Sequence, residues 1–377
     1  MNERVALLLP SFELGGVERM MLRLADGFIQ RGLAVDLVVV RKDGPLATEV
    51  PAGARIIDLG GTRALASTFA LVRYLRQVRP RALLTAKDYI NIVALWARQL
   101  SGVPVRIVVS VRINPILHFQ HVTKLREKII PMLMRVTYPR ADSVVAVSHG
   151  VAVDLIRFIG IRKDKVHVVY NPVVSDAIFI RAAEPVHHPW FAPGEPPVVL
   201  AVGRLTAQKD FGTLIKAFSL VRKERIARLM ILGEGKERPT LERMVHDLGL
   251  DEVVSLPGFE VNPYKYMKRA AVFVLSSRWE GFGNVLAEAM ALGTPVVSTD
   301  CPSGPAEILE YGRWGDLVPV ADPQALARAI LKRLDERDET KTRGAAARAQ
   351  EFSLRRSVDR YARLLLGERE RDLAMFT

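Results

Sequence analysis

Short apolar runs alternate along this chain with segments whose apolar residues recur at helical spacing. The runs are continuous and do not alternate with polar residues, which is typical of strands buried on both faces of a parallel sheet. In the first half, strands are expected at residues 5–10, 34–40, 81–85, 105–110, 143–147 and 166–169. This alternation predicts an α/β fold with a doubly wound parallel sheet, in which ligands bind beyond the carboxyl ends of the strands.

The same pattern begins again in the second half, where strands are expected at residues 198–202, 228–232, 253–256 and 271–275. A chain of 377 residues is long enough for two domains, so we expect two Rossmann-like domains, residues 1–180 and 198–352. Residues 181–197 are rich in proline and glycine and are interpreted as a linker. Residues 353–377 begin with a helical pattern and predict a final helix.

The chain is basic, with 54 Lys and Arg against 41 Asp and Glu and a net charge of +13. Such an excess suits nucleic acid, an anionic membrane surface or phosphorylated substrates, and a generally basic surface is the bland alternative. No zinc-ligand spacing, aromatic RNA-binding strand or long lysine tract accompanies the charge, so neither a nucleic-acid partner nor a metal site is expected.

The single cysteine, Cys301, excludes an intramolecular disulfide and fits a reducing compartment. No apolar stretch approaches the roughly 20 residues of a membrane span, and the first strand is too short for a signal peptide. We therefore expect a cytoplasmic protein.

Glu288 is an isolated charge, because every other residue at positions 285–292 is apolar. Its helical neighbours four positions away are Asn284 and Leu292, so no local cation neutralises it. A buried and unpaired carboxylate is costly, which leads us to expect a ligand hydroxyl as its partner. The alternative is a buried glutamate that pairs with a distant arginine.

A glycine turn separates Glu288 from a second carboxylate, Glu280, which is either a ligand-binding group or a solvated loop residue. The turn follows a strand and opens a helix, an arrangement that aims backbone N–H groups at an anion. Carboxylates on both sides of an anion site suit a nucleotide sugar, with hydroxyls at both ends and phosphate in the middle. The substrate-binding residues expected in the turn are Gly281, Phe282, Gly283 and Asn284.

Two further loops follow strands of the predicted sheets. Gly15 and Gly16 come after the first strand and either allow the backbone close to a ligand or form a plain turn. Arg204 and Lys209 come after the strand at residues 198–202 and either clamp a diphosphate or lie solvated in their loop.

Arg112 and His118 follow the strand at residues 105–110 and are candidates to face the ligand-binding cleft. A histidine is easily poised for proton transfer, although a lone one is more often structural. Residues 121–140 then form a basic amphipathic segment, either a surface for an anionic membrane or lipid diphosphate, or an ordinary half-buried helix.

The chain resembles the retaining glycosyltransferases of family 4 over nearly its full length. Glu280 and Glu288 match the E-x7-E motif, and residues 203–210 match the phrase G-R-L-x-x-x-K-[DN]. The resemblance implies two domains that face across a cleft (the GT-B fold), with a final helix that crosses back to the first domain. It also implies that Gly16 lies against the donor phosphates.

The resemblance further assigns roles in the second domain. Arg204 and Lys209 hold the diphosphate without an essential metal or other cofactor, Glu280 orients the sugar, and Glu288 binds the ribose diol. The turns that border the base and ribose contain Gly233, Glu234 and Phe259.

The function implied is a retaining, metal-independent transfer of a sugar from a nucleotide donor, with UDP as the default. The acceptor would be a glycan or a polyprenyl-diphosphate-linked glycan of a bacterial surface polymer, and the protein would be peripheral on the inner face of the plasma membrane. Val111 and Ile113 depart from the S-E-R-N-[DN]-P phrase of the members that extend lipid-linked saccharides, so the acceptor is not carried over.

Three alternative functions differ in what they require of the sequence. A nucleotide-sugar epimerase would share the fold but has no need of the paired glutamates and the Arg/Lys clamp, and a glycan phosphorylase would need a pyridoxal cofactor and a longer chain. A basic membrane- or RNA-binding adaptor would carry a vestigial site, which the presence of Arg204, Lys209, Glu280 and Glu288 argues against.

Overall fold

The computed structural model describes residues 3–61, 66–114, 116, 129–336 and 338–368. The chain forms two compact units, one made of residues 1–172 with 354–377 and the other of residues 173–353. Residues 173–197, interpreted as the end of one domain and a linker, therefore lie in the second unit. The final helix α16 (Leu354–Leu366) lies in the first.

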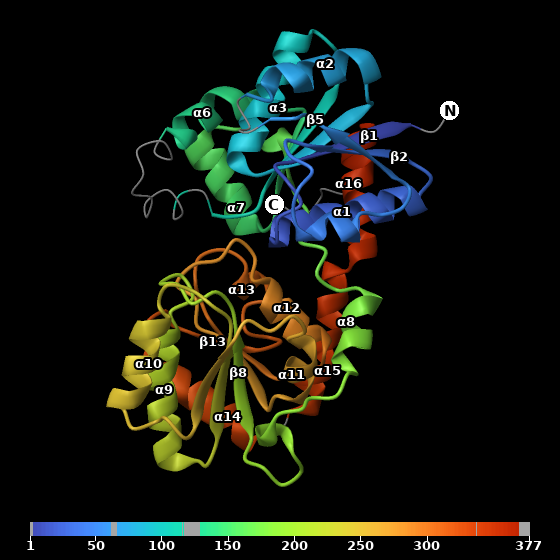
Figure 1. Cartoon of the computed structure of the whole chain (residues 1–377). Coiled ribbons are helices and arrows are strands. Elements are labelled where there is room, and N and C mark those ends of the chain that lie inside the picture. The colour runs from blue at the N-terminus through green and yellow to red at the C-terminus, as the bar shows by residue number, and fades with distance from the viewer. Residues whose placement is uncertain (1–2, 62–65, 115, 117–128, 337, 369–377) are drawn as a thin grey trace. The chain divides into compact units, whose positions relative to one another are not determined.

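The first unit is built on a parallel sheet with the strand order β3-β2-β1-β4-β5-β6-β7. Its strands are β1 (Arg4–Leu9), β2 (Ala34–Val39), β3 (Ala54–Asp58), β4 (Ala82–Ala86), β5 (Arg106–Val111), β6 (Ser143–Ala146) and β7 (Val166–Val168). Most of these strands are buried along nearly their whole length, because helices cover both faces of the sheet (Figure 1). This burial explains why the strands are continuous apolar runs in the sequence.

Helix α1 (Gly16–Gln30) packs against α16 on one face of this sheet. On the other face lie α2 (Thr68–Val78), α3 (Asp88–Ser101) and α6 (Ile130–Thr137), while α7 (His149–Asp154) follows β6. Helix α1 turns Met21, Leu24 and Phe28 toward the core at the spacing of one helical face. Tyr361 and Leu365 of α16 complete the same core.

Strand β3 was not predicted, and its residues explain why. It is an edge strand that pairs only with β2, and its burial is incomplete. Arg55 and Asp58 interrupt its apolar residues, so the segment lacks the continuous apolar run that marks the inner strands.

The second unit contains a parallel sheet with the strand order β10-β9-β8-β11-β12-β13. Its strands are β8 (Val198–Val202), β9 (Arg228–Leu232), β10 (Val254–Gly258), β11 (Val272–Leu275), β12 (Val296–Thr299) and β13 (Asp316–Val318). Helices α9 (Phe211–Glu224), α10 (Arg238–Asp247) and α14 (Pro323–Asp335) pack on one side. Helices α8 (Asp176–Ala182), α11 (Tyr264–Arg269), α12 (Asn284–Ala291) and α15 (Glu339–Ala349) pack on the other, and α13 (Pro305–Ile308) precedes β13.

Each sheet has one point at which the order of its strands reverses direction. In the first unit this point lies between β1 and β4, and in the second between β8 and β11. The helices that follow the two central strands leave in opposite directions there, which opens a crevice at the carboxyl ends. The loops after these four strands are therefore where a ligand is expected to bind.

Candidate functional site

Lys209 and Glu280 meet at the point of strand reversal in the second unit. Lys209 Nζ donates a hydrogen bond to Glu280 Oε1 at 2.5 Å, and Ser277 Oγ donates to the same oxygen at 2.7 Å. The two charged side chains are only 15% and 9% exposed. Burying a charge is costly unless it is paired and hydrogen-bonded, so each residue of this pair holds the other in place.

The loops that carry this pair are joined by further hydrogen bonds. Ser276 Oγ donates to the Lys209 carbonyl at 2.7 Å, and Gln208 Nε2 donates to the Trp279 carbonyl at 2.9 Å. The loop after β8 and the turn after β11 therefore form one supported surface. A site held on adjacent strand ends in this way is pre-organised for a ligand.

Asp210 occupies the N-cap position of α9, but its side chain does not cap a helix amide. Its Oδ2 atom accepts hydrogen bonds from Thr213 Oγ1 at 2.9 Å and from Arg278 Nε at 3.0 Å. The ion pair between Arg278 and Asp210 is a second link between the same two loops.

The glycine turn ends at Gly283, which is the N-cap of α12 and has φ = 103°, a conformation that favours glycine. Phe282 is buried, and its ring lies edge-on to Phe352 at 5.1 Å between centroids. Asn284 begins the helix and is exposed, while Gly281 lies buried in the turn. The turn thus leads from Glu280 directly to the first residue of α12.

The expectation that Glu288 is buried without a protein partner is wrong. Its side chain is half-buried, and Tyr264 Oη of α11 donates a hydrogen bond to Oε1 at 3.3 Å. Arg181 lies over the Tyr264 ring, 5.2 Å from its centroid, but the described bond to the carboxylate comes from the phenol. Glu288 therefore remains reachable from solvent, with one oxygen oriented by the protein.

The loop after β9 presses against the loop after β8. A Cβ atom on Gly233 would lie 1.9 Å from the Gly203 carbonyl oxygen, so only glycine fits there. The Glu234 carboxylate is bound by Arg238, with contacts of 2.7 and 2.9 Å. This ion pair, which sequence reasoning missed, orients Glu234 at the rim of the site.

Arg204 and Phe259 are both exposed. Phe259 is 69% exposed, next to β10, and Arg204 lies in the loop after β8. Of the two residues of the expected clamp, Lys209 is thus partly buried and paired, whereas Arg204 is exposed.

The thiol of Cys301 lies buried beside the Lys209–Glu280 pair. Burial raises the pKa of Cys301 to about 12, and the negative charge of Glu280 adds to the effect. Thiolate is the reactive form of cysteine, so this thiol has no reactive role near neutral pH.

We expect Cys301 to be nearly inert to a thiol reagent such as dithionitrobenzoate in the folded protein at pH 8. A thiol with a pKa of about 12 in place of 9.0 holds roughly a thousandfold less thiolate at that pH. Because the chain has one cysteine, the absorbance change in native protein and in guanidinium reports this residue alone. Rapid stoichiometric labelling of the native protein would show that the thiol is accessible and ordinary.

In the first unit, Gly15 is the N-cap of α1 and Gly16 is its first residue, immediately after β1 and its loop. Glu18, in the first turn of α1, is buried and forms an ion pair with Lys87. Lys87 directly follows β4, the strand on the other side of the strand reversal. Sequence reasoning missed this pair because its members are far apart in the chain.

Arg112, placed just after β5, is bound to the C-terminal helix. Its Nη1 atom donates to Tyr361 Oη at 3.1 Å and to Ser110 Oγ at 3.3 Å, and the two hydroxyls are 2.9 Å apart. Burial lowers the pKa of Arg112 from its usual value, and the Tyr361 hydroxyl opposes this effect. The guanidinium is thus anchored by α16. His118 lies outside the described residues.

The basic amphipathic segment is described only from residue 129 onward, and residues 121–128 lie outside the described part of the chain. Ile129, Met132 and Val136 are 50%, 70% and 54% exposed on and beside α6. Arg135 Nε donates to the Phe158 carbonyl at 2.8 Å. Three apolar side chains are thus exposed on this part of the segment, and Arg135 is held by a backbone carbonyl.

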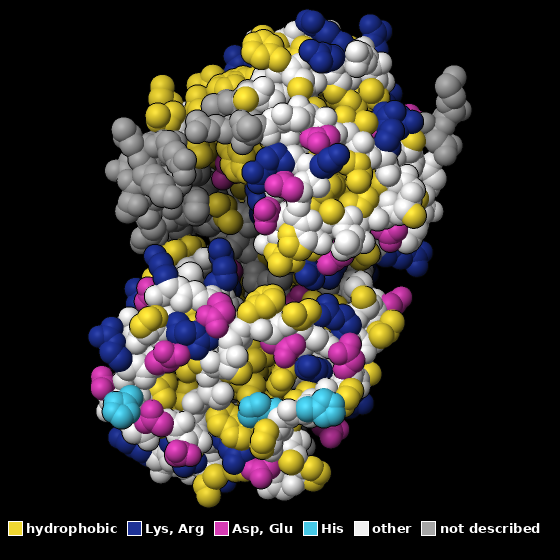
Figure 2. All heavy atoms as spheres, in the orientation of Figure 1, with side chains coloured by type: hydrophobic (Ala, Val, Ile, Leu, Met, Phe, Trp, Pro, Cys, Tyr) yellow, Lys and Arg dark blue, Asp and Glu magenta, His cyan; other side chains and the backbone are white. Residues whose placement is uncertain are grey.

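The described residues contain neither a membrane-spanning helix nor a cluster of metal-binding side chains. Each described helix is too short or too polar to traverse a bilayer. No group of three His, Cys, Asp or Glu side chains in the described ranges is arranged to hold a metal ion. On the face shown in Figure 2, basic and acidic side chains are interspersed in each unit and form no continuous basic patch.

Two family models match the chain, one on each half. Residues 14–176 match "Glycosyltransferase Family 4", and residues 196–336 match "Glycosyl transferases group 1".

Among curated proteins, the chain is 31% identical over 246 residues to the N-acetylgalactosamine-N,N'-diacetylbacillosaminyl-diphospho-undecaprenol 4-alpha-N-acetylgalactosaminyltransferase of Campylobacter jejuni, covering 65% of each chain. It is 27% identical over 342 residues to an uncharacterized glycosyltransferase of Methanocaldococcus jannaschii, covering 81% of this chain and 84% of that protein. The match thus spans just under two thirds of the Campylobacter protein.

Among solved structures, the chain resembles HepE of Anabaena in complex with UDP, with a TM-score of 0.77 and 20% identity. The match covers 97% of this chain and 100% of that one. At this low identity, the likeness establishes the two-domain GT-B fold and nothing further about function.

Proposed function

Because the chain belongs to the family 4-like glycosyltransferases with the GT-B fold, we propose that it transfers a sugar from a nucleotide-diphosphate donor to a saccharide with retention of configuration. The observation that carries this proposal is the buried Lys209–Glu280 pair at the strand reversal of the second unit. The site offers one cation, one carboxylate and helix amides to a ligand that has phosphate and hydroxyls side by side.

The donor we propose is a UDP-sugar. Lys209 and the exposed Arg204 contact its diphosphate, and Glu288, oriented by Tyr264, accepts hydrogen bonds from the ribose hydroxyls. Both described side-chain bonds of Glu280 end on Oε1, so Oε2 is directed to a hydroxyl of the transferred sugar. The UDP complex of HepE supports this choice, since that neighbour has the same fold.

In the proposed reaction, the bond between the anomeric carbon and the diphosphate oxygen breaks as the acceptor oxygen bonds to that carbon on the same face. The acceptor proton passes to the leaving phosphate oxygen, so no protein nucleophile is needed. Lys209 and Arg204 stabilise the negative charge that develops on the departing diphosphate. This is the work that a divalent ion does in other enzymes, so we propose a reaction that needs no metal.

The acceptor we propose is a glycan, either free or linked to a polyprenyl diphosphate, in bacterial surface glycan assembly. The Campylobacter relative is named for a diphospho-undecaprenol saccharide substrate, which supports this class. The exposed Ile129, Met132 and Val136 beside Arg135 would bring the first unit to an anionic bilayer that holds such a lipid. Arg112, held by Tyr361, and His118 are the proposed acceptor-side residues.

A panel of UDP-, GDP- and ADP-sugars tests the proposal, with and without chelator and with saccharide acceptors. We expect transfer, or slow donor hydrolysis without acceptor, from UDP-sugars, and an axial product linkage from an axial donor by proton NMR. Complete loss of activity in chelator would contradict the metal-free reaction. Conversion of a donor to its epimer without acceptor, or no turnover with any donor, would favour the epimerase or the adaptor instead.

A further inference from the structure

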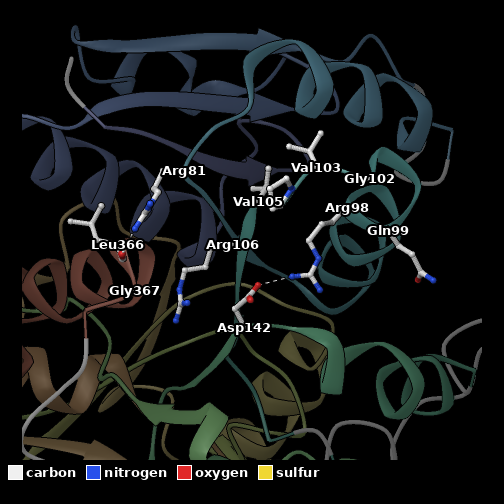
Figure 3. A pocket seen from close by; sticks show the side chains of 11 residues that line it. Arg81, Arg98, Gln99, Gly102, Val103, Val105, Arg106, Asp142, Leu366 and Gly367 are labelled. Atoms are coloured by element: carbon white, nitrogen blue, oxygen red, sulfur yellow. Dashed lines mark hydrogen bonds and ion pairs between the residues drawn. The ribbon is translucent and has the colours of Figure 1, made fainter.

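A cavity of about 640 Å³ lies in the first unit at the edge of the sheet opposite the strand-reversal loops. Arg81 precedes β4, Arg106 begins β5 and Asp142 precedes β6, so the cavity opens at the amino ends of three adjacent strands. Arg98, from α3, completes a ring of charged side chains around the hollow (Figure 3). The proposed transfer reaction uses none of these residues.

Two of the arginines bind the end of the C-terminal helix. Arg81 Nη2 donates to the Leu366 carbonyl at 3.0 Å, and Arg106 Nε donates to the Leu364 carbonyl at 2.6 Å. Arg106 Nη2 also donates to Ser143 Oγ at 3.2 Å. These bonds satisfy carbonyls that a helix end leaves unpaired, and they fix the two guanidinium groups against the cavity.

The third arginine, Arg98, forms an ion pair with Asp142, which is the only carboxylate among the cavity-lining residues. Arg98 Nη1 donates to Asp142 Oδ2 at 2.6 Å, and the Ile107 amide donates to the same oxygen at 2.8 Å. Three guanidinium groups and one carboxylate give the lining a formal charge of 3 − 1 = +2, and Glu3, outside the lining, forms an ion pair with Arg81 at 3.9 Å, which leaves 2 − 1 = +1. Asp142 is thus engaged through Oδ2 and offsets one arginine.

The arginines retain donors that no described bond uses. A guanidinium has five N–H donors, and the described bonds leave Nη1 of Arg81 and Nη1 of Arg106 without an acceptor. Arg81 and Arg106 are neighbours across the sheet edge, where the Arg106 amide donates to the Arg81 carbonyl at 3.3 Å. Both guanidinium groups line the same cavity, so an anion bound there would face two positive charges.

We propose that this cavity binds a phosphate- or diphosphate-bearing small molecule. The surplus positive charge that remains after Asp142 and Glu3 are counted favours an anion, and the planar donor forks of arginine match phosphate oxygens. The volume leaves room for more than one phosphate group, and it lies in the range of ordinary ligand pockets. A free phosphate ester and the headgroup of an anionic lipid share this chemistry.

The test measures hydrogen exchange of the full chain while inorganic pyrophosphate is titrated at constant ionic strength. Because Lys209 is expected to bind diphosphate in the other unit, the titration is repeated in Lys209→Ala. We expect pyrophosphate to slow exchange at residues 98–106 and 364–368 in both proteins. In Arg106→Gln the apparent affinity at this site should fall about 10- to 100-fold, the range for a lost charged hydrogen bond.

Two controls keep the result interpretable. Arg73→Gln removes an exposed arginine of α2 and should leave the response unchanged. Arg81→Lys keeps the positive charge but removes the planar guanidinium group. A thermal melt of each variant shows whether α16 still packs against the first unit, since Arg81 and Arg106 both bind its end. Unchanged exchange in the unmodified protein, or equal protection in Arg106→Gln, would overturn the proposal.

The source of the phosphate is distinguished with vesicles of phosphatidylcholine containing phosphatidylglycerol. Flotation that is reduced by Arg81→Lys and Arg106→Gln but not by Arg73→Gln assigns the cavity to a lipid headgroup. Flotation that is equal in all variants, together with the pyrophosphate response, assigns it to a soluble phosphate ester.

Discussion

Lys209→Ala should lower kcat for sugar transfer by about 10²- to 10³-fold, the range for removal of one group that stabilises transition-state charge. The ammonium would lie where negative charge develops on the leaving diphosphate. Its loss also leaves Glu280 buried without its cation, so the carboxylate loses its fixed position. The measurement is the initial rate at saturating donor, taken with a thermal melt to confirm that the protein is folded.

Lys216→Ala is the matched control for this variant, because Lys216 is an exposed lysine of the adjacent helix α9. It should retain full activity. Lys209→Arg should recover part of the rate, since it keeps a cation at the site. A Lys209→Ala protein that is folded and fully active would remove Lys209 from the reaction.

Glu280→Gln should lower kcat/KM by about 10- to 100-fold, because a charged hydrogen bond is worth roughly 1.5–3 kcal/mol. The neutral amide has nearly the same shape, so the bonds from Ser277 and Lys209 can re-form more weakly. The sugar hydroxyl that faces the other oxygen then loses a charged acceptor. Steady-state kinetics with varied donor concentration measure the effect.

Glu224→Gln, at the exposed end of α9, is the control for loss of one negative charge. We expect it to behave like the unmodified protein. If Glu280→Gln were equally active, the carboxylate would be structural, serving only to hold Lys209.

The sequence was sufficient to locate most of the inner strands, and it singled out Lys209 and Glu280, which the structure brings together. Lys209 and Glu280 each follow a predicted strand, but they are 71 positions apart, and nothing local indicates that they touch. Their contact depends on β8 and β11 being neighbours, which is a property of the strand order. The ion pair between Glu18 and Lys87 depends in the same way on β1 lying beside β4.

Two features were missed for other reasons: the partner of Glu288 lies on a different helix, and strand β13 lies at the edge of its sheet. Glu288 was expected to lack a protein partner because only its helical neighbours could be assessed, yet Tyr264 reaches it from α11. Strand β13, with three residues at the edge of its sheet, is too short to give a clear apolar run. Partners of this kind become visible only when the packing of the elements is known.

The most direct test of the site is a pair of titrations, UDP and uridine, into the unmodified protein and into Lys209→Ala. If Lys209 contacts the donor diphosphate, UDP should bind about 10- to 100-fold more weakly to the variant, while uridine binds both proteins equally. An equal loss for UDP and uridine, or no loss for either, would contradict the placement of the diphosphate beside the Lys209–Glu280 pair.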